Sequence, residues 1–405
     1  MESNDIIVKN FAEIAVNRPL DRTFHYSVPD CLKDSIAVGK RVWVDFGHKR
    51  EVGYVVGFAS SADVETVKPV ESVIDEEPVF SEQMLRVCRW MSGTYMSSLG
   101  EAIAATIPGA IKKGNVRVKP RAGTIEENDA PPPSAPHALT KEQSDALSDI
   151  ADKVESSSYR PFLLHGITAS GKTEVYMQAI ERVMAKGKTS IVLVPEISLT
   201  PQTLERFISR FGDLVAVVHS GLVGSMRYTE WERIRSGRAR IVVGARSAIF
   251  SPVKNLGLII VDEEHETSYK QDDVPRYHAR DVALMRAELS NCPVIMGTAT
   301  PSLESFYLAK KGVYELVRLT KRIEDRQLPR VKVVDMRMEL ETRKKLVMFS
   351  RILVNELENT LKNGKQAIIF LNRRGFATYV SCKKCGYVVK CRRCDAIMVQ
   401  ARSRP

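Results

Sequence analysis

The chain has 405 residues, of which 44% are hydrophobic, and a formal net charge of +11 from 60 Lys and Arg against 49 Asp and Glu. The length suggests two or three domains with ordinary buried cores. No apolar run is long enough to span a bilayer, and the N-terminal MESNDIIVKN lacks a secretory apolar region, so we expect a cytoplasmic protein without membrane contact. The excess of basic residues favours a polyanionic partner such as nucleic acid.

Residues 1–110 predict a small, mostly β N-terminal domain. Short β-type runs alternate there with Gly, Pro and Asp turns, and a helix is expected around Ser81–Ser97. The runs are IIVKNFAEIAV, TFHYSV, KRVWVDF and EVGYVVGFA. Residues 111–138 are charged and then proline-rich, so they cannot build a core, and we expect a linker.

Residues 139–345 predict an α/β lobe. The stretch LTKEQSDAL opens a helix in which Thr140 caps and Gln143 occupies the capping-box position. Continuous apolar runs then alternate with helical segments, which indicates a parallel sheet covered on both faces. The runs are FLLH, SIVLV, LVAVVH, ARIVVG, LGLIIVDEE and PVIMG. A helix at 350–363 and a strand at 366–371 are expected to begin a further unit (346–380), followed by a cysteine-rich segment (381–405).

The first motif with chemistry is GITASGKT, which fits the phosphate-loop pattern G-x-x-x-x-G-K-[ST]. It follows an apolar run and precedes a helical pattern, as such a loop requires. Backbone N–H groups and the helix N-terminus form an anion site, Lys172 would reach the β- and γ-phosphates of ATP, and Thr173 would help hold Mg²⁺. The predicted nucleotide-binding residues are Gly166, Ile167, Thr168, Ala169, Ser170, Gly171, Lys172 and Thr173, with Gln143 in the preceding helix.

Two further motifs follow apolar strands. The run LGLIIV leads into Asp262-Glu263-Glu264-His265, where Asp262 would hold Mg²⁺ and Glu263 would polarise the attacking water. His265 fits a role in relaying the nucleotide state. The run PVIMG leads into Thr298-Ala299-Thr300-Pro301-Ser302, and the hydroxyls of Thr298 and Thr300 are expected to hydrogen-bond to the DEEH segment and couple the two motifs.

These three motifs, in this order and spacing, resemble a superfamily 2 helicase with a RecA-like P-loop motor lobe. The stretches VLVPEISLTPQ, HSGL, GARSAIFSP, DEEHETSYKQDDVPRYHARDVALMRA and GTATPSLES are similar to PriA-type replication-restart helicases. The resemblance runs from about residue 1 to about residue 395. It implies an ATP-driven 3′-to-5′ DNA helicase that recognises stalled forks, works with single-stranded-DNA-binding protein and other primosome proteins, and loads the replicative helicase.

The resemblance also implies DNA-binding residues. Arg246, Tyr269, Lys270, Arg276, Tyr277 and His278 would contact single-stranded DNA, the last five from an aromatic-rich loop that couples DNA binding to ATP hydrolysis. Aromatic faces can stack bases of any sequence, and cations follow the DNA backbone.

In this family the first domain holds the 3′ end of a nascent strand. The matching stretches PLDRTFHYSVP, VDFG and VKPVESVIDEEPVF place the pocket at Phe24, His25, Tyr26, Gly47 and Lys68. Phe24 or Tyr26 would stack a base and Lys68 would meet a phosphate. The chain departs from the family at His25, where the usual residue is an aspartate, and neutral imidazole is a weaker acceptor for a 3′-hydroxyl. We also predict that the family's winged-helix module is missing, because residues 111–138 are too short and too rich in proline.

Cys382-x₂-Cys385-x₅-Cys391-x₂-Cys394 is a zinc-binding pattern. The four thiolates either share one tetrahedral Zn²⁺ or form two halves of sites completed elsewhere, and the five-residue spacer favours the half-sites.

The chain ends eleven residues after Cys394, and LNRRGFATY resembles the start of a second motor lobe. We therefore expect a truncated or frameshifted product. It should bind ATP weakly and hydrolyse it poorly, because the second lobe supplies the arginine finger, which contributes ~10³–10⁵ in rate where measured. Two alternatives are a non-catalytic module that binds forks or single-stranded DNA, and another superfamily 2 translocase.

Overall fold

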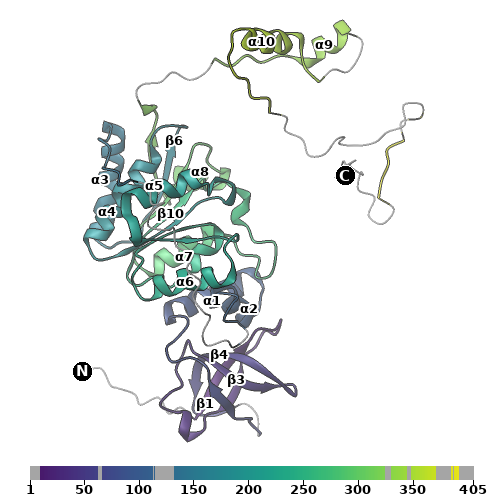
Figure 1. Cartoon of the computed structure of the whole chain (residues 1–405). Coiled ribbons are helices and arrows are strands. Elements are labelled where there is room, and N and C mark those ends of the chain that lie inside the picture. The colour runs from purple at the N-terminus through teal and green to yellow at the C-terminus, as the bar shows by residue number, and fades with distance from the viewer. Residues whose placement is uncertain are drawn as a thin grey trace. The chain divides into compact units, whose positions relative to one another are not determined.

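Two sheets organise the first 327 residues. The computed structural model describes residues 10–62, 66–112, 114, 132–323, 330–343, 348–370, 385 and 387–391. Residues 1–327 form one compact unit and residues 328–405 a second. Within the first unit, we call residues 10–112 the N-terminal domain and residues 132–323 the α/β lobe (Figure 1).

The N-terminal domain is an antiparallel five-stranded sheet with two helices. The strands lie in the order β2-β1-β4-β3-β5, and Ser27 N donates to Lys68 O (3.0 Å), which brings the two edges of the sheet together. Its elements are β1 (Phe11–Val16), β2 (Phe24–Ser27), η1 (Asp30–Leu32), β3 (Arg41–Phe46), β4 (Lys49–Ala59), β5 (Val70–Val73), α1 (Glu82–Tyr95) and α2 (Leu99–Thr106). The predicted β runs are confirmed, and the expected helix is followed by a second one, which Ser98 and Glu101 start with a capping box.

The α/β lobe is a seven-stranded parallel sheet in the order β12-β6-β11-β10-β7-β9-β8. All six predicted strands are present, and the edge strand β12 was not predicted. The elements are α3 (Lys141–Glu155), β6 (Pro161–Gly166), α4 (Lys172–Ala185), β7 (Thr189–Leu193), η3 (Glu196–Ser198), α5 (Pro201–Phe211), η4 (Gly212–Leu214), β8 (Val215–Val218), α6 (Gly224–Arg235), β9 (Ile241–Gly244), η5 (Arg246–Phe250), β10 (Leu256–Asp262), η6 (Thr267–Tyr269), α7 (Ala279–Leu289), β11 (Val294–Thr298), α8 (Leu303–Lys310) and β12 (Glu315–Leu319).

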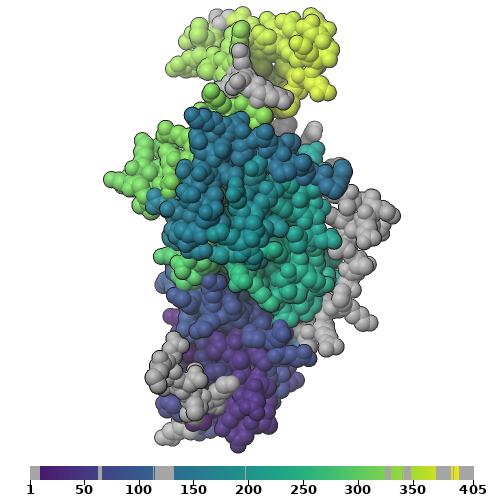
Figure 2. All heavy atoms as spheres, turned by 90° about the vertical axis from the view of Figure 1, so that its left-hand side faces the viewer, coloured from purple at the N-terminus to yellow at the C-terminus, as the bar shows by residue number. Residues whose placement is uncertain are grey.

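Side chains of each lobe strand alternate between two separate cores. On β10, for example, Leu258 and Ile260 pack on one face, whereas Ile259 and Val261 pack on the other. Helices α3, α4 and α5 cover the first face, with α3 and α4 in front in the space-filling view (Figure 2), and α6, α7 and α8 cover the second. Continuous apolar strands are therefore required because both faces of the sheet are buried.

The second core continues into the N-terminal domain. Helices α1 and α2 contribute buried residues such as Met91 and Ile103 to the same cluster as α7 (Figure 1). Helices α1 and α7 run antiparallel, since Gln83 Nε2 near the start of α1 donates to Leu289 O (3.0 Å) at the end of α7, and Tyr95 Oη at the end of α1 donates to Asp281 Oδ2 (3.0 Å) near the start of α7. The two domains thus share one hydrophobic core.

The second unit, residues 328–405, contains α9 (Met336–Arg343) and α10 (Arg351–Lys362). Helix α10 confirms the predicted helix at 350–363. The predicted strand at 366–371 is wrong for residues 366–370, which pair with no described strand and leave Ile368 97% and Phe370 84% exposed. The predicted lobe boundary at residue 345 lies later than the boundary at Gln327.

The predicted linker and the missing winged helix concern residues that are largely outside the described ranges, so both stay predictions. Within the described part of the chain, every helix is too short or too polar to cross a membrane.

Candidate functional site

The loop between β6 and α4 has the geometry of a phosphate loop. Ala169 (φ 65°) and Gly171 (φ 80°) turn the backbone through the left-handed region. Lys172 Nζ donates to Gly166 O across the loop (3.0 Å). Ser170 Oγ is buried and lacks a hydrogen-bond partner among the described residues. The loop therefore brings together a cation, an orphaned hydroxyl and the N-terminus of α4.

Gln143, in the preceding helix α3, holds this loop in place through a hydrogen bond to its backbone. Its Oε1 accepts from Thr140 N (2.8 Å), and its Nε2 donates to Ser170 O (2.8 Å). A Cβ on Gly171 would lie 2.2 Å from Gln143 Nε2, so only glycine allows this close approach. Gln143 is 3% exposed, and both ends of its carboxamide are used within the protein. Its effect on a bound nucleotide would act through the position of the loop.

Asp262, at the end of β10, is held by two buried tyrosines. Tyr176 Oη from α4 donates to Asp262 Oδ1 (3.0 Å), and Tyr269 Oη donates to Asp262 O (2.7 Å). Burial, and then the charge of Glu263, raises the pKa of Asp262 to about 6. Burial also raises the pKa of Tyr176 well above its usual value, so its hydroxyl remains a donor. The carboxylate is fixed beside the phosphate loop, where Lys172 Nζ lies 3.9 Å from Glu263 Oε1.

The predicted contact between DEEH and the following hydroxyls is present. His265 Nδ1 is 2.8 Å from Thr298 Oγ1, and its Nε2 is 3.4 Å from Thr300 Oγ1. Thr298 Oγ1 also donates to Glu263 Oε2 (3.5 Å). The pairing of β10 with β11 sets Asp262 opposite Gly297 and so aligns the two strand ends. His265 therefore connects the DEEH segment to the Thr298–Thr300 segment.

Glu264 is the residue of DEEH that the sequence interpretation passed over. Its side chain is fully buried and accepts from Ser302 N (2.7 Å), Ser305 Oγ (2.8 Å) and Arg280 Nη1 (3.0 Å). Arg280 was not singled out either, although it joins α7 to the start of α8. Glu264 thus ties three elements together at the carboxyl edge of the sheet.

The segment 267–281, which links DEEH to α7, is ordered by its own contacts. Tyr269 is 1% and Tyr277 4% exposed, and the Tyr277 ring packs edge-on against Phe250. The predicted base stacking on Tyr269 and Tyr277 does not fit this structure, because both rings belong to the core. The exposed residues of the segment include two cations, Lys270 and Arg276, and two carboxylates, Asp272 and Asp273, beside Thr267 and Val274. His278 caps α7 by accepting from Arg280 N (3.3 Å), and burial lowers its pKa, so the ring is a neutral acceptor.

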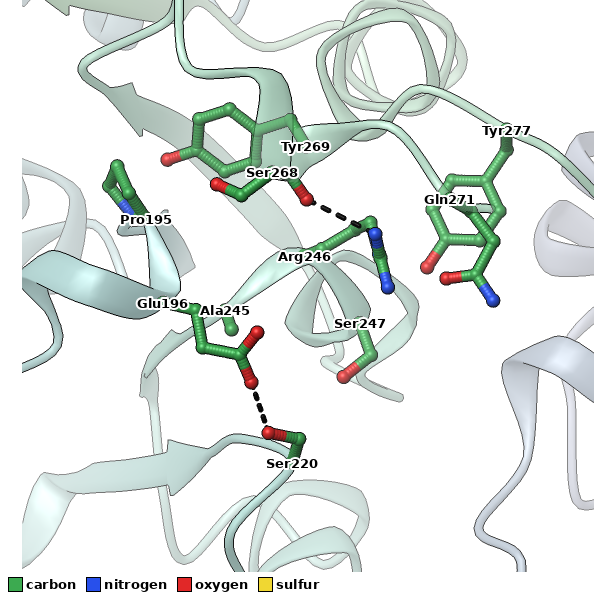
Figure 3. Close-up of a pocket in the computed structure, with 10 residues that line it drawn as sticks. All are labelled: Pro195, Glu196, Ser220, Ala245, Arg246, Ser247, Ser268, Tyr269, Gln271 and Tyr277. Atoms are coloured by element: carbon green, nitrogen blue, oxygen red, sulfur yellow. Dashed lines mark hydrogen bonds between the residues drawn. The ribbon is translucent and has the colours of Figure 1, made fainter. Parts of the chain in front are cut away.

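Arg246 fastens this segment to the end of β9. Its Nη1 donates to Ser268 O (3.1 Å) and to Lys270 O (2.5 Å). Figure 3 shows the guanidinium between Ser268 and Ser247 in a small cavity of about 70 Å³, with Glu196 bonded to Ser220 on the opposite wall. The cavity is bounded by the carboxyl ends of β7, β8 and β9 and by the segment 267–281.

A larger groove of about 830 Å³ extends from this cavity along the same edge of the sheet. It contains His265 of DEEH, Arg246 and Lys270, together with Ser302 beyond β11. Parallel strands end at one edge of a sheet, which is where such folds bind ligands. One groove therefore borders the DEEH motif, and its lining combines the cations Arg246, Lys270 and Arg280 with the carboxylates Glu196, Glu264, Glu266, Asp272 and Glu304.

In the N-terminal domain, Asp45 is the common partner of two predicted pocket residues, Tyr26 and Lys68. Tyr26 Oη donates to Asp45 O (3.1 Å), and Lys68 Nζ pairs with Asp45 Oδ2 (2.9 Å). The hydrogen bond from Lys68 holds the pKa of Asp45 below its usual range. Tyr26 is only 5% exposed, so the predicted stacking of a base on its ring does not fit this structure. The sequence interpretation had not identified Asp45.

Phe24 and Gly47 remain suited to a ligand. Phe24 is half-buried and packs edge-on against Phe46 (ring centroids 5.0 Å apart). A Cβ on Gly47 (φ 57°) would meet no atom within 4 Å, so the turn between β3 and β4 borders open space. His25 lies on the same strand as Phe24, opposite Glu13 of β1.

Of the four predicted zinc ligands, Cys382 and Cys394 lie outside the described residues, whereas Cys385 and Cys391 are described and form no disulfide. Among described residues, no three His, Cys, Asp or Glu side chains gather as a metal site. Zinc binding stays a prediction.

Two family models match the chain. Residues 13–108 match the 3′ DNA-binding domain of PriA, and residues 140–307 match the DEAD/DEAH box helicase domain. The α/β lobe is therefore a helicase lobe of the DEAD/DEAH class, joined to a 3′ DNA-binding domain.

Relatives in several bacteria share this combination. The chain is 36% identical to the replication restart protein PriA of Bacillus subtilis, covering 97% of this chain and 66% of the relative. It is 41% identical to that of Treponema pallidum, covering 94% and 57%. The chain belongs to the PriA family of replication restart proteins. It spans 57–66% of the length of these two relatives.

A solved structure, RecG bound to a three-way DNA junction, matches 57% of this chain and 29% of its own with a TM-score of 0.40 and 24% identity. A likeness of this size adds nothing to the assignment.

The residues fit ATP and Mg²⁺, which helicases of this class use. The orphaned Ser170 hydroxyl and the Lys172 ammonium are suited to phosphate oxygens, and the Asp262 carboxylate is a hard oxygen ligand for Mg²⁺. When bound, the metal would neutralise charge on the phosphates. Glu263 would orient the attacking water, and Lys172 would exchange Gly166 O for a phosphate oxygen.

Mg²⁺-dependent nucleotide binding is expected to weaken about 4-fold between pH 7.5 and pH 5.5. The pKa of Asp262 is about 6, so most of its carboxylate is protonated at the lower pH and cannot bind the metal. This pKa lies above the ordinary aspartate value of 3.8, so the folded state takes up the proton first. The cost of burying the charged carboxylate therefore disappears, and the nucleotide-free protein becomes more stable, as the pH falls from 6 to 4. Titration of a fluorescent ATP analogue against Mg²⁺ at both pH values measures the effect. Asp262→Asn is the control, and an equal pH dependence in this variant would assign the effect to other groups.

Proposed function

We propose that this chain is the strand-end-binding and ATP-binding part of a 3′-to-5′ DNA helicase that recognises stalled forks and initiates primosome assembly. The observation that carries the proposal is the meeting of the phosphate loop, DEEH and Thr298–Thr300 at one sheet edge, beside a groove, in a lobe whose core is shared with the 3′ DNA-binding domain. Single-stranded DNA would follow this groove, and a 3′ end would be held by the N-terminal domain.

In the α/β lobe, the proposed DNA contacts are made by cations. Lys270 and Arg276 are exposed, and Arg246 lines the groove, so phosphates could replace the backbone carbonyls to which these side chains now donate. Tyr269 and Tyr277 would act by fixing the segment 267–281 rather than by stacking. His278 would hold the start of α7.

In the N-terminal domain, Phe24 is the proposed stacking residue and Lys68 the phosphate contact. Gly47 would let a nucleotide approach the backbone closely, and His25 would accept one hydrogen bond from a terminal hydroxyl. Tyr26 would position the site through its bond to Asp45. We further propose that the protein is cytoplasmic and that its partners are single-stranded-DNA-binding protein and other primosome proteins. Zn²⁺ would be bound by Cys382, Cys385, Cys391 and Cys394.

Lys68→Ala is expected to weaken binding of an oligonucleotide with a recessed 3′-hydroxyl about 3- to 10-fold, because the phosphate loses a charge-assisted hydrogen bond. Fluorescence anisotropy at fixed salt, on forks whose nascent strand ends in a 3′-hydroxyl or a 3′-phosphate, measures the loss and the preference between ends. Lys33→Ala is a matched control, because Lys33 pairs with Asp30 at 2.7 Å as Lys68 pairs with Asp45 at 2.9 Å. Equal loss in both variants, or equal affinity of the wild-type chain for both ends, would contradict a strand-end site at Lys68.

A further inference from the structure

Tyr95, the last residue of α1 in the N-terminal domain, contacts the segment 267–281 at two points, Lys270 and Asp281. Lys270 Nζ lies 4.9 Å from the centroid of its ring, and its hydroxyl donates to Asp281 Oδ2 (3.0 Å). Trp90, one turn earlier on α1, packs edge-on against the ring (centroids 5.8 Å apart, 88°) and restricts its orientation. A single side chain of one domain therefore holds two points of the other.

Lys270 is also the point at which the segment meets the nucleotide motifs. Its neighbour Tyr269 donates its hydroxyl to Asp262 O (2.7 Å), the backbone carbonyl of the residue that would bind Mg²⁺. The carbonyl of Lys270 accepts from Arg246 (2.5 Å), which lies in the groove. A displacement of Lys270 would consequently move its neighbour Tyr269, which is hydrogen-bonded to the backbone of Asp262 in DEEH.

A DNA phosphate would compete with two groups for the Lys270 ammonium, the ring of Tyr95 and Arg276 O, to which Lys270 Nζ donates (2.5 Å). Lys270 is exposed, and a cation over an aromatic ring at an exposed site is held only weakly. A phosphate that draws Lys270 towards the groove would remove it from the ring, while Tyr95 keeps its bond to Asp281. Tyr95 can therefore lose its contact with Lys270 and still keep its hydrogen bond to Asp281.

We propose that Tyr95 is a positioning residue that fastens the segment 267–281 to the N-terminal domain and thereby couples DNA binding to the nucleotide site. This inference rests on the proposed function for the identity of the two ligands, DNA and a nucleotide. The attachment of the segment 267–281 to the N-terminal domain does not depend on that function. Tyr95 contacts neither a nucleotide nor the predicted DNA pocket, and acts through Lys270 and Asp281.

Hydrogen–deuterium exchange of the full chain tests the fastening directly. The amide of Gln271 donates to Tyr277 O (2.8 Å) and closes the turn between Lys270 and His278. In Tyr95→Leu, which loses both ring and hydroxyl, we expect exchange at this amide to be about 10-fold faster. Tyr95→Phe keeps the ring, so we expect its exchange rate at this amide to lie between those of the wild type and Tyr95→Leu. Unchanged exchange in Tyr95→Leu would overturn the proposal.

The control variant is Gln83→Ala. Gln83 lies on the same helix and also bridges the two domains, but it bonds to Leu289 and Ser290 at the far end of α7. If the domain contact matters only for overall stability, Gln83→Ala and Tyr95→Leu will accelerate exchange at Gln271 equally, and the proposal fails.

Coupling is measured as the ratio of affinities for a fluorescent ATP analogue with and without a single-stranded oligonucleotide. We expect a ratio of about 5 or more in the wild-type chain and in Gln83→Ala, within the usual range for linked sites, and a ratio below about 2 in Tyr95→Leu. A wild-type ratio in Tyr95→Leu would overturn the coupling role. A ratio of 1 in the wild-type chain would count against the proposed function instead, and exchange at Gln271 would still decide whether Tyr95 fastens the segment.

Discussion

Lys172→Ala is expected to weaken ATP binding by about 10- to 150-fold, the range that a charge-assisted hydrogen bond of about 1.5–3 kcal/mol produces. Lys172 begins α4 and already reaches across the phosphate loop to Gly166 O, so its ammonium is the cation available to the phosphates at this end of the sheet. Any DNA-stimulated ATP hydrolysis should be lost at the same time, because the same cation stabilises charge on the transferred phosphoryl group. Titration with a fluorescent ATP analogue and phosphate release with and without a fork measure the two effects.

Lys186→Ala is the matched control for this experiment. Lys186 follows the other end of α4 and donates to Glu155 O (2.9 Å), away from the loop, so the variant should bind ATP as the wild type does. Fork binding that responds neither to ATP nor to Lys172→Ala would favour the alternative function, a DNA-binding module without a motor.

Glu264→Ala is expected to lower the free energy of unfolding by about 3–5 kcal/mol, because the half-buried Arg280 guanidinium loses its buried carboxylate and keeps the more exposed Asp281, 3.6 Å away. The substitution also removes the acceptor for Ser302 N and Ser305 Oγ, so the start of α8 should loosen from the DEEH segment. Urea unfolding followed by tryptophan fluorescence measures the change, since Trp231 is buried in the α/β lobe.

Glu266→Ala provides the comparison. Glu266 is two residues further on and about a third exposed, and its Oε1 lies 3.9 Å from Nε2 of the His265 ring. A change within about 0.5–1 kcal/mol is expected there. A loss of less than 1 kcal/mol in Glu264→Ala would show that the network around Arg280 is not what secures α8.

The sequence predicted the α/β lobe well because its signals are local. Strands buried on both faces must be continuously apolar, and the phosphate loop must follow one of them, so both are readable without knowing the partners of each residue. The sequence also indicated that the hydroxyls after the PVIMG strand would contact the DEEH segment, and Thr298 does contact His265 and Glu263. The edge strand β12 was missed because Glu315 and Arg318 interrupt the apolar residues of ELVRL, so the stretch does not read as a continuous apolar run.

The errors arose where tertiary contacts decide. The resemblance to PriA-type helicases led us to expect base stacking on Tyr269 and Tyr277, and on Phe24 or Tyr26, yet all three tyrosine rings are buried. The sequence could not reveal Asp45 or Tyr95 as contacts, because their partners are 23 and 186 residues away. For Glu264 no local signal was available either, because its partners Arg280, Ser302 and Ser305 lie 16, 38 and 41 residues away.

The core shared by α1, α2 and α7 makes the N-terminal domain a fixed extension of the α/β lobe within residues 1–327. A tethered domain would present a captured strand end over a range of distances, whereas a domain built on the same core presents it at one. Under the proposed function, the distance between a bound 3′ end and the groove would therefore be fixed by this shared core. Forks whose strand end lies at another distance from the single-stranded template would then bind less well, whatever their sequence.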